Sequence, residues 1–210
     1  MSKRQGWFAN TLMSAAAVAS ALAISAPAHA QFSDSYKFLD AVKKQDGQVV
    51  TDYLNEPGTT IVNTRDITSG DSALHIVTQR RDVAWIRFLV AKGADPNIQN
   101  TKGVTPLALA VGLGFIEGAE ALLDAGARVD DASQTGETPL ISAVHRRDVA
   151  LVRALLKAGA NPDRADNSGR SARDYAALDG PSNQILSAIE STAKQENRPA
   201  APGKVYGPTF

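Results

Sequence analysis

Cysteine is absent from this sequence of 210 residues. That absence excludes disulfide bonds, zinc sites with cysteine ligands, iron–sulfur clusters and thiol catalysis. An excess of one charge is missing too, because 22 Lys and Arg residues balance 22 Asp and Glu residues. We therefore do not expect nucleic-acid binding, which needs a basic surface field. The 43% of hydrophobic residues suffices for a packed core, and the length suits one domain or two small ones.

The first thirty residues differ from the rest of the chain. Lys3-Arg4 is followed by an uncharged stretch of mostly Ala, Val, Leu and Ile over 11–26, and then by Ala28-His29-Ala30. This order predicts a secretory signal peptide over 1–30, cleaved before Gln31. An uncleaved membrane anchor and a buried core helix are the alternatives. Only one of the paired arginines of a twin-arginine signal is present, so we expect the general secretory route.

Export would place the remaining chain, 31–210, in the periplasm. No later segment approaches ~18 consecutive apolar residues, so we expect a soluble chain without a membrane-spanning helix. Removing a signal with two basic residues and no acidic one leaves 20 basic and 22 acidic residues, a net charge of −2. Because cysteine is absent, stability in that oxidising compartment cannot depend on disulfides.

A period of 33 residues organises the exported part. Four positions repeat with this spacing: Gly70, Gly103, Gly136 and Gly169; Leu74, Leu107 and Leu140; Leu89, Leu122 and Leu155; Gly93, Gly126 and Gly159. A fixed period of this length is the signature of a repeat protein, in which each unit packs only on its neighbours.

Each unit predicts a helix–turn–helix. In 103–107 and 136–140 glycine suits a tight turn, threonine an N-cap and proline the first helical position, and Ser72 replaces threonine in the first copy. A second helix with apolar residues three apart begins about ten residues later and ends at the second repeated glycine.

These units resemble ankyrin repeats, whose opening is of the Thr-Pro-Leu-His type. The resemblance implies an all-α ankyrin-repeat solenoid of about five helix pairs with projecting turns, over 31–193. Its parts are an N-terminal cap at about 33–66, repeats at about 67–99, 100–132 and 133–165, a C-terminal cap at about 166–193, and a flexible tail at 194–210. In the C-terminal cap Arg173 and Asp174 replace the leucine and histidine, which suits an end that faces water.

Catalytic and metal-binding patterns are missing from the sequence. The resemblance implies that His75 braces adjoining turns and that His145 faces the concave surface of the solenoid. Asp130-Asp131 and the pair Asp163 and Asp166 lack the spacing of a calcium loop. We therefore expect no enzyme, no metal and no cofactor.

The resemblance also implies that partners meet the turn tips and the concave face. The candidate protein-binding residues, mapped by register, are Asp71, Gln79, Arg80, Lys92, Lys102, Val104, Leu113, Glu137, His145 and Arg146. Arg80-Arg81 and Arg146-Arg147 flank Leu113-Gly114-Phe115, so together they suit an acidic, aromatic-bearing segment. The alternative is that the arginines only sit at solvated helix ends, where the dipole favours them.

Two further features leave alternatives open. Trp85 and Gly118 share a register, so the indole of Trp85 fills the space that Gly118 leaves, or else the glycines merely loosen the second repeat. Lys204–Phe210, at the end of the tail, is less polar than a linker and either docks on a protein surface or stays free.

The sequence therefore predicts a non-catalytic, monomeric protein–protein interaction module in the periplasm. Similar small exported bacterial ankyrin proteins imply support or regulation of another envelope protein, with some relatives linked to oxidative-stress defence. The alternative is a stoichiometric inhibitor or immunity-type binder of an exported enzyme or toxin. In neither case do the residues identify the partner.

Overall fold

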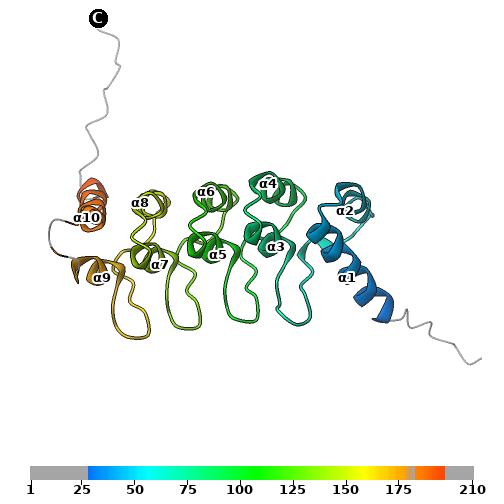
Figure 1. The fold of residues 1–210 in the computed structure, drawn as a ribbon, viewed down its shortest axis with the longest axis horizontal. Coiled ribbons are helices and arrows are strands. Elements are labelled where there is room, and N and C mark those ends of the chain that lie inside the picture. Colours follow the sequence, from blue (N-terminus) through cyan, green and yellow to red (C-terminus); the bar gives the residue numbers. More distant parts are fainter. Residues whose placement is uncertain (1–27, 179, 181–182, 197–210) are drawn as a thin grey trace, which may run out of the picture.

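The computed structural model describes residues 28–178, 180 and 183–196, so most of the predicted signal peptide and the end of the tail lie outside it. The described chain forms five helix pairs in a row, with long turns projecting from one side (Figure 1). The predicted all-α solenoid is confirmed. No helix in this part of the chain is both long and apolar enough to cross a membrane.

The elements follow one another as an inner and an outer helix in each pair. They are α1 (Ala28–Lys44), α2 (Gly47–Leu54), the 3-10 helix η1 (Ile61–Asn63), α3 (Ala73–Gln79), α4 (Val83–Ala91), α5 (Pro106–Gly112), α6 (Ile116–Asp124), α7 (Pro139–His145), α8 (Val149–Lys157), α9 (Ala172–Leu178) and α10 (Gln184–Glu196). The inner helices α3, α5, α7 and α9 lie between the turns and the outer helices (Figure 1).

The inner helices begin as the repeated motif predicts. The hydroxyls of Thr105 and Thr138 accept hydrogen bonds from the amides of Ala108 and Ile141, and a proline follows each threonine. Each of these caps satisfies an amide that the first helical turn leaves without a partner. The outer helices α4, α6 and α8 are each followed, after one capping residue, by a glycine with positive φ, such as Gly93 at 87°, which only glycine adopts without strain.

The core lies between the inner and outer layers. The repeated leucines, Leu74, Leu107 and Leu140 on the inner helices and Leu89, Leu122 and Leu155 on the outer ones, are all fully buried. A single pair cannot cover this apolar face, so the contact between neighbouring pairs stabilises the fold.

The C-terminal cap keeps the local structure of a repeat with different side chains. The carboxylate of Asp174 accepts hydrogen bonds from the amide and hydroxyl of Ser171, at 2.9 and 2.8 Å. Arg173 points to the preceding turn and pairs with Asp163 at 2.6 Å. The polar residues of the last unit therefore complete an N-cap and an ion pair.

His75 braces two repeats, as the resemblance implied. Its Nδ1 accepts a hydrogen bond from the amide of Ser72, and its Nε2 lies 2.9 Å from the carbonyl of Val104 in the next unit. These partners require the neutral ring with its proton on Nε2. Burial lowers the pKa of His75, against the smaller opposing effects of the Val104 carbonyl and Asp71.

The space at Gly118 is filled, but not by Trp85. A Cβ atom at Gly118 would clash with the ring of Phe115, which precedes α6, whereas Trp85 packs edge-on against Phe88. The reason lies in the N-caps: Asp82 caps α4 by accepting from the amide of Trp85, while Phe115 has no such oxygen and folds its ring over Gly118 instead. The packing hypothesis was right about the glycine and wrong about its partner.

Gly118→Ala should therefore destabilise the protein by about 1–3 kcal/mol, because the added methyl overpacks the ring of Phe115. Gly112→Ala is the matched control: it also lies in a helix, and a Cβ there meets nothing within 4 Å. This control should gain up to ~1 kcal/mol from helix propensity. Urea unfolding of both variants measures the difference, and a stabilising Gly118→Ala would contradict the packing.

The lowered pKa of His75 predicts a loss of stability in mild acid. Below an unfolded-state pKa of about 6.5 the unfolded chain takes up a proton that the folded chain refuses, so the free energy of unfolding falls by at most ~1.4 kcal/mol per pH unit. His75→Gln can still accept from the Ser72 amide, as in a Ser-x-x-Gln capping box, and should flatten this slope. Thermal unfolding of the wild type and of His75→Gln against pH tests this prediction, and equal slopes for the two proteins would contradict it.

Candidate protein-binding surface

The exposed side of the inner helices, together with the projecting turns, forms one continuous surface, called the inner surface below. One register position places Ile76, Leu109, Ser142 and Tyr175 on four successive inner helices. All four are half-buried. Because the helices stack side by side, these residues form a row that is apolar except at Ser142.

Hydrogen bonds hold the projecting turns in a fixed ladder. The amide and hydroxyl of Thr101 donate to the carbonyl of Ser69, at 3.0 and 2.7 Å. The side chain of Gln134 donates to the Thr101 carbonyl, and that of Asn167 to the Gln134 carbonyl. Each turn is thus tied to the one before it, so the inner surface is ordered before any partner arrives.

Three of the arginines at the ends of the inner helices link neighbouring repeats. Arg80 donates to the carbonyl of Val42 at 2.7 Å, and Arg146 donates to that of Gly112 at 2.8 Å. Arg81 donates to the carbonyl of Leu113. These carbonyls lie at helix C-termini, which lack intrahelical donors and carry the negative end of the dipole. Each guanidinium thus binds the C-terminal end of a helix in a neighbouring repeat, a contact that neither interpretation of these arginines had predicted.

The other candidate residues are distributed over two layers. Gln79 and Lys102 are exposed on the inner surface, while Asp71, Val104 and Leu113 are half-buried there. The carboxylate of Asp71 accepts from Asn100, and Leu113 packs against the core. Lys92 ends the outer helix α4 and donates to Asn55, so it lies away from the inner helices.

Glu137 and His145 come together with residues of the C-terminal cap. Nδ1 of His145 lies 3.5 Å from the carboxylate of Glu137, and its ring meets the ring of Tyr175 edge-on at 4.5 Å. The guanidinium of Arg170 lies over the ring of Tyr175, 5.9 Å from its centroid. Tyrosine, histidine and arginine here form an aromatic and polar cluster, a composition typical of binding centres.

A hydrogen bond to Asp166 fixes the position of Tyr175. The tyrosine hydroxyl donates to this carboxylate at 2.8 Å, and the hydroxyl of Ser168 donates to it at 2.7 Å. The hydrogen bond from Ser168, and to a smaller extent that from Tyr175, holds the pKa of Asp166 far below its ordinary value. The carboxylate therefore stays charged in the physiological range and keeps the ring of Tyr175 in place.

Tyr175 and Arg170 were missing from the predicted set, although the sequence contained the signal. Arg170 lies 33 residues after Glu137, and Tyr175 lies 33 residues after Ser142. Extending the register of the inner surface into the C-terminal cap would have found both.

No group of three or more histidine, aspartate or glutamate side chains is placed to hold a metal ion within the residues that the structure describes. Polar side chains of the inner surface make ion pairs and hydrogen bonds within the protein.

The link between Arg80 and Val42 predicts a structural role that can be separated from binding. Arg80→Ala should destabilise the protein by about 1.5–3 kcal/mol, because the Arg80 side chain is only 20% exposed and makes a charged hydrogen bond. Arg87→Ala, exposed on α4, should change stability by less than ~0.5 kcal/mol. Chemical unfolding of the two variants decides this, and equal stabilities would remove the structural role of Arg80.

Known proteins resemble this chain through the same repeats. A family model described as ankyrin repeats in three copies matches residues 38–133, and one described as ankyrin repeats in many copies matches residues 122–176. The nuclear factor NF-kappa-B p110 subunit of Drosophila melanogaster is 38% identical over 64 residues, 30% of this chain and 7% of that protein. A transient receptor potential cation channel subfamily A member 1 homolog of Caenorhabditis elegans is 35% identical over 66 residues, 31% of this chain and 6% of that protein.

The matched stretch covers about a third of this chain and less than a tenth of the length of either relative. The family models describe ankyrin repeats, a non-catalytic fold that binds proteins. Because the two family matches together run from residue 38 to residue 176, from α1 into α9, the chain belongs to the ankyrin-repeat family.

Proposed function

We propose that this ankyrin-repeat protein is exported to the periplasm and there binds an envelope protein through its inner surface, in support of that protein's role in the stress response. The basic, then apolar, then small-residue order of 1–30 supports export. The resemblance to small exported bacterial ankyrin proteins supports the kind of partner.

One observation supports the binding role: a row of apolar side chains stays partly exposed to water beside a hydrogen-bonded ladder of turns. Ile76, Leu109 and Tyr175 keep part of their apolar surface in water, while the turns beside them are fixed by Thr101, Gln134 and Asn167. A surface that is already ordered loses little conformational entropy on binding, so more of the contact energy becomes affinity.

The inner surface carries charges of both signs, and this limits the kinds of partner segment that it can bind. Glu137 and Arg170 flank the aromatic cluster, and Lys102 lies on a turn tip. Both signs are present within one small area, so the partner segment should be apolar at its centre and carry charges of both signs at its rim.

The test is affinity capture from a periplasmic extract of the source cells. Leu109→Glu places a charge at the centre of the apolar row and should weaken capture at least ~tenfold, because central apolar contacts dominate binding energy. Ala150→Glu, an exposed position on the outer helix α8, is the matched control and should capture as the wild type does. Thermal unfolding must show that both variants fold.

Three outcomes separate the parts of this proposal. Equal capture by Leu109→Glu would exclude the inner surface as the binding site. Recovery of the chain from the cytoplasm, without an N-terminus at Gln31, would contradict export and leave the binding role standing. A captured enzyme that loses its activity on binding would identify the chain as an inhibitor instead of a supporting protein.

A further inference from the structure

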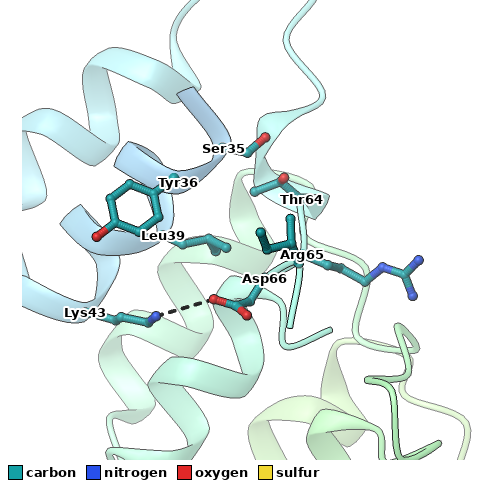
Figure 2. A pocket seen from close by; sticks show the side chains of 8 residues that line it. Ser35, Tyr36, Leu39, Lys43, Thr64, Arg65 and Asp66 are labelled. Atoms are coloured by element: carbon teal, nitrogen blue, oxygen red, sulfur yellow. Dashed lines mark ion pairs between the residues drawn. The ribbon is translucent and has the colours of Figure 1, made fainter. Parts of the chain in front are cut away.

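A pocket lies at the N-terminal end of the solenoid, outside the apolar row of Ile76, Leu109 and Tyr175 on which the proposed function rests. It has a volume of about 140 Å³ and lies between α1 and the segment 64–67 of the first projecting turn. Figure 2 shows Leu39 pointing from α1 toward this segment, with the ion pair of Lys43 and Asp66 joining the two walls. The pocket is therefore apolar in the middle and polar at one end.

Exposed apolar side chains gather at the rim of this pocket. Tyr36 is 69% exposed and Ile67 is 84% exposed, and both line it. The described chain has two more exposed large apolar residues, Val49 and Leu178, and neither of these lines the pocket. Adjacent exposed apolar groups beside a pocket are typical of a contact site.

The position of the pocket follows from the ladder of turns. Thr101, Gln134 and Asn167 each tie a turn to the one before it, but the first turn has no turn before it and faces α1 instead. The side chains of α1 do not fill this space completely. The N-terminal end of the ladder thus stays open beside apolar walls.

The chain itself contains a segment with the matching chemistry. In the part after Glu196, Tyr206 combines an apolar ring with a polar hydroxyl, and it follows Lys204-Val205 in a sequence rich in proline and glycine. An apolar cavity of about 150 Å³ accepts benzene, so a pocket of about 140 Å³ admits one such ring. The hydroxyl would then meet the ion pair of Lys43 and Asp66.

We propose that Tyr206 of one copy of this chain occupies the pocket between α1 and residues 64–67 of a second copy. The reach of the tail disfavours the pocket of its own chain. The ten steps from Glu196 to Tyr206 span at most about 36 Å, and only when this segment is fully extended. The pocket lies four helix-pair spacings away from α10, about 32–40 Å along the solenoid before any sideways path (Figure 1).

Reciprocal exchange of the two tails limits the assembly to a dimer, because each copy then has both its tail and its pocket in use. Two chains side by side in opposite directions bring the tail of each beside the pocket of the other, so two identical contacts form one symmetric dimer. The second contact forms within an already joined pair, which raises the stability of the dimer above that of one contact. This dimer would replace the monomer that the sequence led us to expect.

Sedimentation velocity of the full chain over a wide concentration range tests the proposal. The wild type should dimerise, and Tyr206→Ser should weaken dimerisation at least ~tenfold because the ring loses its buried area. Ile67→Glu should do the same from the pocket side, and its exposed position leaves the fold intact. Phe210→Ser in the tail and Leu178→Glu on α9 are the matched controls and should dimerise as the wild type does.

A labelled peptide of residues 197–210 gives the second measurement. It should bind the full-length Tyr206→Ser chain, whose own tail cannot compete, and should not bind the Tyr206→Ser, Ile67→Glu double variant. A chain that stays monomeric at every concentration, or one whose dimer survives both Tyr206→Ser and Ile67→Glu, overturns the proposal. Binding of only a foreign protein at the pocket would overturn it as well.

Discussion

The contact between consecutive repeats is the interaction on which the rest of this structure depends. A helix pair of this size covers only one of its apolar sides, so each unit needs its neighbour to bury leucines such as Leu107. The same boundary carries the hydrogen bond from His75 to the Val104 carbonyl and the bonds from Thr101 to Ser69. Stability and the order of the binding surface therefore come from one set of contacts, because the bonds that join the repeats also fix the turns.

The second repeat shows how neighbouring units adjust to one another. It has Leu113 where the flanking repeats have Arg80 and Arg146, and it has Gly114 in the following position. A Cβ atom at Gly114 would clash with the guanidinium of Arg146, which lies across this glycine on its way to the Gly112 carbonyl. The glycines of this repeat are thus sites where a neighbouring side chain takes the space, as the ring of Phe115 does at Gly118. Where this repeat has a glycine in place of a larger residue, a nearby side chain occupies the space that the glycine leaves.

How much the sequence predicts follows from how local each signal is. The 33-residue period and the caps Thr105 and Thr138 are local in the chain, so the number of units and the start of each inner helix could be predicted correctly. Contacts between units depend on side-chain direction, which the period does not contain. Trp85 and Phe115 illustrate this, because the choice of which ring fills the space at Gly118 depends on which residue caps the outer helix.

The contacts of the arginines could not be predicted either, because they also depend on side-chain direction. The sequence places Arg80 and Arg146 two units apart on one face, but the carbonyls to which they donate belong to other repeats. The N-terminal pocket was hidden because the register changes there. The left-handed residues Arg81, Gly114 and Arg147 are 33 positions apart, whereas Gln45 precedes Arg81 by 36, so α1 cannot be aligned on the repeat.

The terminal unit at each end of the solenoid has a side that no further repeat covers, and the two ends differ in how this side is made compatible with water. At the C-terminal end, polar side chains replace apolar ones: Asp174 completes its own N-cap and Arg173 pairs with Asp163, so that end meets water with its polar groups satisfied. At the N-terminal end, α1 is 17 residues long where the inner helices of the repeats have seven, and it covers the first repeat with an apolar face. Beside the first turn this cover leaves Tyr36 and Ile67 in water. One end is thus closed by charge, and the other by an incomplete apolar contact that leaves a pocket beside an apolar rim.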